Sequence, residues 1–372
     1  MYIERGRMGN EAKMRLIKLD QLTDEMILAK TLYDGRGMLI LPAGAELNTH
    51  RDQLLNFNIQ YLHVEDTISQ GVEMSSLFSE ETRIEINETV RKFKRIYQHV
   101  DDPKKKTFFD LPYSKLAKKI TEDIFKRTQR ESYIDISELV VNQAYDFAHD
   151  LNVGIMCAVM GRVYGMNPDN SYHLCMGGFL HDIGLLALPE ALMEKFGSKS
   201  MASTDLDMYR QYPIFGYDML KHNQAINLIT KSAVLQHKEH YDGSGFPSHK
   251  REDEISLPAK IVAVINTFEK LLFGRDPEYG RMKIYEIIKH ILQRSGTMFD
   301  PNVVAKFIRH LVIFPNGTVV NLNNGNTGIV VRQNPGKISR PIIRLIDGDF
   351  IDNFIELDLK DIDDLNIEDV VV

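Results

Sequence analysis

Adjacent histidine and aspartate residues at positions 181 and 182 are the most chemically informative pair in this sequence. His181-Asp182 ends the segment Gly177-Gly178-Phe179-Leu180. On a helix, such a pair can offer an imidazole nitrogen and a carboxylate to neighbouring metal positions. His149 precedes the pair by about thirty residues, and His237 follows it. Three separated helical segments could therefore converge on one metal centre.

A glycine-rich loop follows the last of these histidines. It reads Asp242-Gly243-Ser244-Gly245-Phe246-Pro247. Gly243, Gly245 and Pro247 are typical of a tight turn, and a turn alone could explain them.

The elements that must position these residues are mainly helical. Residues 132–311 alternate long helical patterns with short loops,. We therefore expect a multidomain, mainly α protein, with an all-helical core between a small α+β module and a small β module. The expected order is a disordered leader (1–13), an N-terminal β-rich module (14–70), a helical linker or packing helix (80–128), the helical domain (130–312) and a C-terminal β-rich module (313–372).

Local patterns support the flanking modules. The run Leu39-Ile40-Leu41 follows a hairpin signal at Asp34-Gly35-Arg36-Gly37,. A short helix is expected from Thr49 to Asn56, and a strand from Ile59 to Val64. One buried helical stripe is predicted at Ile86, Val90, Phe93 and Tyr97,. After residue 313, β-branched runs alternate with the turn dipeptides Asn316-Gly317, Asn324-Gly325 and Asp347-Gly348, which indicates a meander or open barrel,.

Composition excludes several partners. The 372 residues carry a net charge of −7, with 43% hydrophobic and 26% charged residues. This balance offers no general attraction for DNA or for an anionic membrane, so an anionic ligand needs a local basic cluster. No apolar run approaches the ~20 residues that span a bilayer. The two cysteines, Cys157 and Cys175, lack metal-type or redox-type neighbours, and we expect a reduced cytoplasmic protein,.

From about His149 to Asp300 the chain resembles the HD-GYP domain, a branch of the HD phosphohydrolase superfamily. The Gly-Tyr-Pro block that names the branch reads Gly245-Phe246-Pro247, and later blocks match at 257–264 and 295–301. The resemblance implies an all-helical fold that holds a metal centre and hydrolyses the phosphodiester bonds of cyclic di-GMP. The flanking modules are similar to those of bacterial cytoplasmic members.

When the family pattern is compared residue by residue with this sequence, several metal-ligand positions differ. His149, His181, Asp182 and His237 match ligand positions of the family. Three further ligand positions, two histidines and one aspartate in the family, are Tyr212, Lys238 and Asn266. Two other family positions, a lysine after His-Asp-Ile-Gly and a glutamate for a third metal, are Leu185 and Tyr145.

These substitutions leave the two expected metal sites with different numbers of ligands. In the family Asp182 would bridge two metals, and the first would keep His149 and His181, with Asn266 as a poor fourth ligand. The second would keep only Asp182 and His237, while a protonated lysine at 238 has no lone pair and repels a cation. We therefore expect either one divalent transition metal, Fe or Mn, or a metal-free hydrogen-bonded cluster.

Several residues could contact a ligand. The ammonium of Lys238 could replace a missing metal, pairing with Asp182 or with a ligand phosphate, or it could be a surface lysine beside Glu239. Phe246 could stack on a guanine base, because stacking needs no phenol hydroxyl. Arg275 occupies a basic position of the family near the ligand, or it is an exposed loop charge. The candidate ligand-binding residues are Lys238, Gly243, Gly245, Phe246, Pro247 and Arg275.

Two functional hypotheses remain from the sequence. The first is a non-catalytic member that binds cyclic di-GMP or a related nucleotide, or contacts signalling proteins. The second is an enzyme with a one-metal site that hydrolyses cyclic di-GMP or another nucleotide. The substitutions at Tyr212, Lys238 and Asn266 favour the first hypothesis,.

Overall fold

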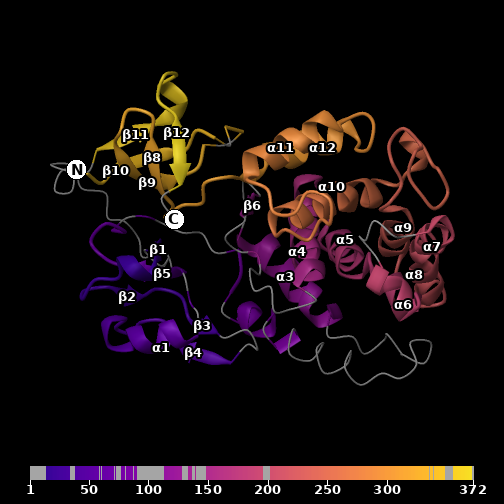
Figure 1. Ribbon diagram of the computed structural model, residues 1–372, viewed down its shortest axis with the longest axis horizontal. Coiled ribbons are helices and arrows are strands. Elements are labelled where there is room, and N and C mark those ends of the chain that lie inside the picture. Colours follow the sequence, from indigo (N-terminus) through magenta and orange to yellow (C-terminus); the bar gives the residue numbers. More distant parts are fainter. Residues whose placement is uncertain are drawn as a thin grey trace. The chain divides into compact units, whose positions relative to one another are not determined.

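In the computed structural model the chain forms two compact units. One unit is Leu77–Leu311, and the other combines Met1–Ser76 with Val312–Val372 (Figure 1). The structure describes residues 14–33, 38–57, 59, 61–70, 72, 77–79, 81–86, 88–89, 113–127, 133–135, 139, 148–195, 202–334, 336–337, 339–347 and 355–370. The expected leader 1–13, Asp34–Gly37, Val90, Phe93, Tyr97, Tyr145 and Gly348 lie outside the described residues.

The helical unit is built around two central helices, α4 (Ala148–Val163) and α5 (Pro168–Leu180). Nearly every side chain of α4 is buried, as expected for a helix that is apolar on all sides,. The helix α5 begins at Pro168, and the preceding residue, Asn167, caps it by accepting a hydrogen bond from the Asn170 N–H. Both the cap and the proline favour a helix start at this point. This buried pair carries the first two histidines of the expected centre.

Glycines allow α4 and α5 to approach closely. A Cβ atom on Gly178 would lie 2.7 Å from the Gly154 Cα, and a Cβ on Gly154 would overlap the Phe179 ring. Only a hydrogen fits at these two positions, so the helix backbones are in direct contact. This close packing fixes the spacing between His149 at the start of α4 and His181 at the end of α5.

Further helices surround this pair. The helix α3 (Tyr113–Arg127) packs on both, and its Leu116, Ala117, Ile120 and Ile124 are fully buried at helical spacing,. The helix α3 is thus part of the core of this unit. α9 (Leu228–Gln236) packs on α5, and α10 (Leu257–Leu272) packs on α4 and α9.

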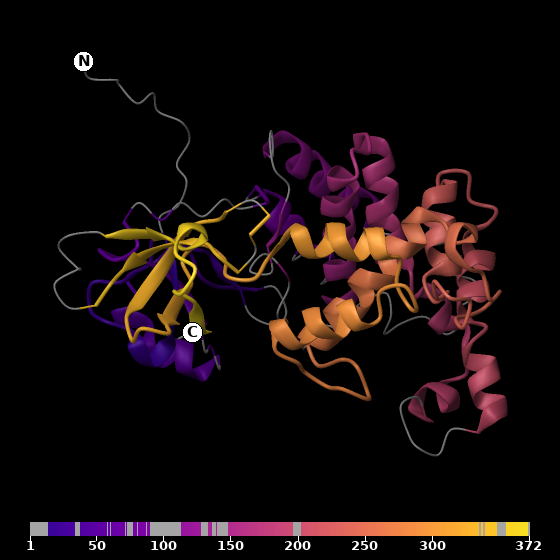
Figure 2. The ribbon, with the colours of Figure 1, turned by 90° about the horizontal axis from the view of Figure 1, so that it is seen from above.

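The remaining helices of the unit are shorter. α11 (Ile284–Gln293) and α12 (Pro301–Arg309), orange in Figures 1 and 2, pack on α10. The 3-10 helix η6 (Ile183–Ala187) packs on α8 (Tyr212–Leu220). The other helices are α6 (Glu190–Lys195), α7 (Ser203–Tyr209) and the 3-10 helix η7 (Glu252–Glu254). The unit also contains the short strand β6 (Ile134–Asp135), and the strand β7 (Leu311–Val312) begins at its last residue.

The second unit contains two main antiparallel sheets. The N-terminal sheet has the order β1-β5-β2, from β1 (Arg15–Lys18), β5 (Tyr61–Glu65) and β2 (Ile27–Leu28). The hairpin β3 (Leu32–Tyr33) and β4 (Leu39–Leu41), the 3-10 helices η1 (Leu19–Gln21) and η2 (Asn48–His50) and the helix α1 (Arg51–Asn56) complete this part. Its core includes Ile17, Leu28, Leu47, Leu54 and Val64.

The C-terminal sheet has five strands in the order β11-β10-β9-β8-β12. They are β8 (Val319–Leu322), β9 (Thr327–Arg332), β10 (Ile342–Leu345), β11 (Glu356–Asp358) and β12 (Ile367–Val370), with the 3-10 helix η9 (Leu359–Asp361) after β11. Gly325, in the turn between β8 and β9, has a φ of +86°, which explains a glycine there,.

The N- and C-terminal parts of this unit share contacts. Val72 is fully buried against Ile329 and Val331 of β9. Arg344 of β10 donates hydrogen bonds to the Gln70 carbonyl and, at 2.8 Å, to Glu356 Oε1. The unit therefore depends on residues from both ends of the described chain.

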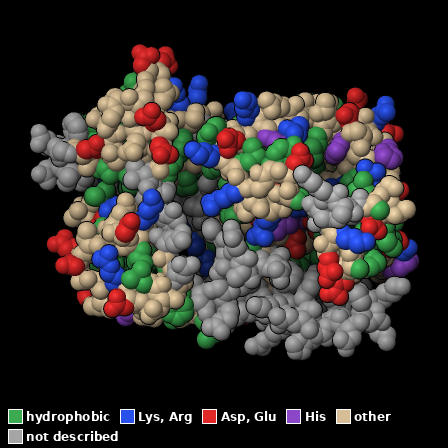
Figure 3. Space-filling view, in the orientation of Figure 1, with side chains coloured by type: hydrophobic (Ala, Val, Ile, Leu, Met, Phe, Trp, Pro, Cys, Tyr) green, Lys and Arg blue, Asp and Glu red, His purple; other side chains and the backbone are tan. Residues whose placement is uncertain are grey.

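None of the helices in the described part of the chain has the length and hydrophobicity needed to cross a lipid bilayer. On the face drawn in Figure 3, acidic and basic side chains are interspersed within each unit. This mixture agrees with the modest net charge of the sequence.

Candidate metal centre

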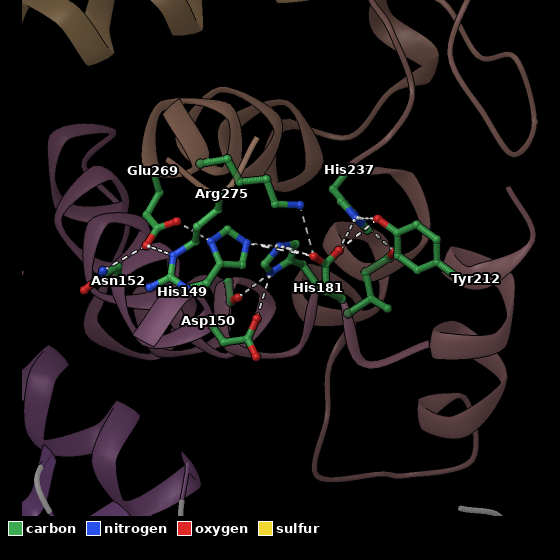
Figure 4. A network of polar contacts seen from close by, with 12 residues as sticks. His149, Asp150, Asn152, His181, Tyr212, His237, Glu269 and Arg275 are labelled. Atoms are coloured by element: carbon green, nitrogen blue, oxygen red, sulfur yellow. Dashed lines mark hydrogen bonds and ion pairs between the residues drawn. The ribbon is translucent and has the colours of Figure 1, made fainter. Parts of the chain in front are cut away.

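Two histidines and one carboxylate converge in the helical unit. His149 Nε2 lies 3.2 Å from His181 Nε2, and Asp182 Oδ2 lies 3.3 Å from His181 Nε2 and 3.9 Å from His149 Nε2 (Figure 4). Ligands bound to one ion at about 2.1 Å are themselves roughly 3.0–3.5 Å apart. We call these three atoms the first acceptor group. Two of their separations lie within this range, and the third, at 3.9 Å, is slightly wider, so the group could hold a single metal ion.

The hydrogen bonds of the rings turn their lone pairs inward. His181 Nδ1 donates to the Gly178 carbonyl at 2.8 Å, and His149 Nδ1 donates to the Glu269 carboxylate. In neutral rings both Nε2 atoms then carry lone pairs, and two lone pairs that face each other repel unless a proton or a metal ion lies between them. The donor set therefore fits one metal ion.

Asn266 supplies a further observation in favour of a metal. Its carbonyl oxygen is buried and has no hydrogen-bond partner among the described residues. Asn266 lies on α10, the helix that also carries Glu269. An unpaired buried amide oxygen is costly, and a cation would satisfy it.

A second acceptor group lies on the other side of Asp182. His237 Nδ1 donates to the Val234 carbonyl at 2.9 Å, which leaves the lone pair on Nε2, 3.2 Å from Asp182 Oδ1. The Tyr212 hydroxyl lies 2.8 Å from Asp182 Oδ1, to which it donates, and 2.7 Å from His237 Nε2. Tyr212 therefore occupies the point at which these two acceptors meet, and the group does not fit a second metal.

The backbone holds Tyr212 in this place. A Cβ on Gly184 in η6 would lie 1.8 Å from the Tyr212 carbonyl oxygen. The glycine therefore lets η6, which directly follows Asp182, pack against the first turn of α8. The Tyr212 ring is fully buried, and burial together with the charge of Asp182 raises its pKa, so the hydroxyl stays protonated.

Asp182 is ionised and has a cationic partner that the sequence did not suggest. Lys270 Nζ lies 3.3 Å from Asp182 Oδ2. Burial alone would raise the pKa of Asp182, but the neighbouring His181, Lys270 and His237 hold it well below its usual range. The expected pairing of Asp182 with Lys238 is therefore replaced by a pairing with Lys270.

Lys238 is half-buried and makes no ion pair with a carboxylate of the described residues. Burial and the nearby Lys270 lower its pKa to about 8, and Asp182 and Asp276 oppose this shift. Lys238 is also not a surface lysine paired with Glu239. The carboxylate of Glu239 instead accepts hydrogen bonds from the Ser248 and Lys250 N–H groups.

Glu269 is a second residue that the sequence interpretation missed. It is fully buried, accepts hydrogen bonds from His149 Nδ1 and, at 2.9 Å, from Asn152 Nδ2, and lies 3.5 Å from Arg275 Nε. Burial would raise its pKa, but His149, Asn152 and Arg275 lower it. Because helical residues three and four apart share a face, Asn266 could have drawn attention to Glu269 and Lys270.

Arg275 is not an exposed loop charge. It faces Glu269, and its Nε and Nη2 atoms are buried without a hydrogen-bond acceptor among the described residues. A guanidinium with unused N–H groups can bind the oxygens of a phosphate or carboxylate.

The glycine-rich loop has a well-defined local structure. Gly243 has a φ of +83°, and a Cβ on Gly245 would lie 2.4 Å from the Lys238 carbonyl oxygen. Phe246 is half-buried, with its ring 6.3 Å from that of Tyr212 in an edge-on arrangement, and Pro247 follows it through a cis peptide bond. The loop therefore lies against the tyrosine of the second acceptor group.

Comparison with known proteins agrees with this geometry. The model of the HD domain family matches residues 113–303, just over half of the chain. A cyclic di-GMP phosphodiesterase of Pseudomonas aeruginosa is 25% identical over 212 residues, covering 57% of this chain and 50% of the relative. The cyclic di-GMP phosphodiesterase PdeB of Borreliella burgdorferi is 25% identical over 214 residues, covering 58% of this chain and 55% of the relative.

The match thus spans about half the length of these curated relatives. Among solved structures, a HDG"Y"P protein from Bdellovibrio bacteriovorus is 14% identical, with a TM-score of 0.42, over 79% of this chain and 98% of that chain. The family match itself covers α3, the paired helices α4 and α5, and all residues of both acceptor groups. The chain therefore belongs to the HD domain family.

Proposed function

We propose that this protein binds cyclic di-GMP or a related cyclic dinucleotide as a non-catalytic signalling module, with at most one metal ion. The observation that carries the proposal is the position of the Tyr212 hydroxyl between Asp182 Oδ1 and His237 Nε2. A two-metal hydrolase needs both positions to hold the attacking and the leaving oxygen. With one position filled by a phenol, that arrangement cannot form.

The relatives support the ligand class. Proteins similar to this chain are named for cyclic di-GMP, and one from Vibrio cholerae is named a 3'3'-cGAMP-specific phosphodiesterase. In this chain, Arg275 offers unused N–H groups to a phosphate, and the half-buried Phe246 offers a ring edge to a base,. Gly243, Gly245 and Pro247 would act by shaping the loop that carries Phe246.

The first acceptor group supports one bound metal, Fe or Mn. His149, His181 and Asp182 would hold it, with Asn266 as a weak fourth ligand, and it would act as a Lewis acid toward a phosphoryl oxygen. This intact group also favours the second hypothesis, a one-metal phosphodiesterase.

Two measurements separate the hypotheses. Cyclic di-GMP should raise the melting temperature of the protein by mass action, and Phe246→Ala and Arg275→Ala should each reduce the shift. Cyclic di-GMP should remain intact after prolonged incubation with excess Mn²⁺ or Fe²⁺. Turnover under these conditions would favour the one-metal enzyme, whereas no thermal shift at high ligand concentration would favour a protein partner as the ligand.

A further inference from the structure

Lys270 occupies an unusual place for a lysine. It lies on α10, one helical turn after Asn266 and next to Glu269, so it reaches the metal centre from the same helix face,. Its ammonium lies 3.3 Å from Asp182 Oδ2, an atom of the first acceptor group, and its side chain is 23% exposed. The ammonium would therefore compete with a metal for one ligand oxygen, and the side chain that carries it is partly exposed.

Both oxygens of Asp182 are engaged by protein hydrogens. Tyr212 donates to Oδ1 at 2.8 Å, and Lys270 contacts Oδ2 at 3.3 Å. A buried carboxylate without a counter-charge is costly, and a metal ion would normally supply that charge at such a site. Here the chain supplies the charge from Lys270 and the hydrogen bond from Tyr212.

We propose that Lys270 is a built-in cation that takes the place of one metal ion at Asp182 Oδ2 and presents its remaining N–H groups to a phosphate oxygen of the ligand. An ammonium has three N–H donors, and the contact with Asp182 uses one of them. The ligand part of this inference rests on the proposed function, whereas the metal part does not.

A metal count tests the first part. The variant with Tyr212→His, Lys238→His and Asn266→Asp regains the ligand types of a two-metal centre, but it keeps Lys270. With excess Mn²⁺ it should bind one ion per chain, and the same variant with Lys270→Ala should bind two. The inference is overturned if the variant that keeps Lys270 already binds two ions, or if both folded variants bind one.

A milder change covers the case in which these variants fail to fold. Lys270→Met keeps the aliphatic stem and removes the ammonium from Asp182 Oδ2. We expect the Kd for the first Mn²⁺ to fall by at least about tenfold, because a cation in close contact is removed. Lys289→Met, at an exposed position on α11, is the matched control and should leave the Kd unchanged. An unchanged Kd in Lys270→Met would overturn the inference.

Metal-free protein tests the ligand part. After treatment with EDTA, the parent should bind cyclic di-GMP in isothermal titration calorimetry. Lys270→Met should weaken binding by about tenfold or more, and Lys289→Met should not. Equal binding by Lys270→Met and the parent would overturn the phosphate contact. If the parent itself binds no cyclic di-GMP, the proposed function fails, while the metal counts still decide the role of Lys270.

Discussion

The single hydroxyl group of Tyr212 lies between Asp182 and His237. It donates its proton to Asp182 Oδ1 at 2.8 Å, and its oxygen lies 2.7 Å from His237 Nε2. Without it, Asp182 Oδ1 would lose its closest donor. A hydrogen bond to a charged group contributes about 1.5–3 kcal/mol to stability. The size of that contribution can be measured because phenylalanine keeps the ring and removes only the oxygen.

Tyr212→Phe should therefore reduce the free energy of unfolding by about 1–3 kcal/mol in metal-free protein. Urea unfolding followed by circular dichroism measures this difference. Tyr285→Phe removes a hydroxyl from a ring that is 63% exposed, and it should change stability very little. Equal stability of Tyr212→Phe and the parent would show that the hydroxyl contributes nothing at this place.

The buried histidines make stability depend on pH. Burial lowers the pKa of His149 and of His237 from 6.5 to about 4. Between these values the unfolded chain binds more protons than the folded one, so stability falls as the pH drops from about 6.5 to 4. Burial has the opposite effect on Asp150, because it raises the pKa of this carboxyl group from 3.8 to about 7. The folded protein therefore holds the Asp150 proton below pH 7, and this proton stabilises the folded state as the pH falls.

Asp150→Asn should remove this compensation. Between pH 7.5 and pH 5, the metal-free variant should lose about 2 kcal/mol more stability than the parent. Urea unfolding at the two pH values, in the presence of EDTA, measures the difference. The same loss in the variant and the parent would contradict a protonated Asp150 in the folded protein.

The helix α10 carries two side chains that contact residues of the centre and a third whose buried oxygen is unpaired among the described residues. Asn266 offers an unpaired oxygen, Glu269 accepts from His149 Nδ1, and Lys270 contacts Asp182. The spacing of three and four residues places them on one helix face. The orientation of His149 thus depends on how α10 packs against α4.

Glu269→Gln tests that dependence. The amide keeps the size of the side chain but weakens the acceptor that holds the His149 Nδ1–H. Loss of such an outer contact commonly lowers metal affinity by about 10–100-fold. Mn²⁺ titration should show this loss, and Glu286→Gln, on α11, should bind Mn²⁺ like the parent. Unchanged affinity in Glu269→Gln would show that Glu269 does not orient His149.

The sequence predicted some of these features for physical reasons that can be named. The helical core and the family followed from the blocks around His149, His181 and Asp182, and the family match confirms both. The direction of the Tyr212 hydroxyl depends on the contact between η6 and α8, which no local pattern reveals. Lys238 could be identified from the sequence because it occupies a ligand position of the family pattern. The contact between Lys270 and Asp182 depends on tertiary packing, which the sequence does not reveal.

At the scale of the whole molecule, α3 determines where an independent helical unit can begin. Its buried residues Leu116, Ile120 and Ile124 pack against α4 and α5. A fragment that begins at residue 130 would expose that apolar surface, and removing large buried side chains costs about 2–5 kcal/mol each.

We expect the fragment 77–311 to unfold cooperatively on heating, and the fragment 130–311 to aggregate or melt without a sharp transition. Differential scanning calorimetry of both fragments is the measurement. A cooperative transition of 130–311 at the temperature of the longer fragment would show that α3 is dispensable.

The shared contacts of the second unit have a consequence during translation. Val72 leaves the ribosome well before Ile329 and Val331, and at 5–20 residues per second the delay is on the order of ten seconds or more,. During that interval the newly made N-terminal sheet lacks its partner, while the helical unit between them can already fold. Synthesis thus sets an order of assembly in which the first segment of the chain is among the last to be completed.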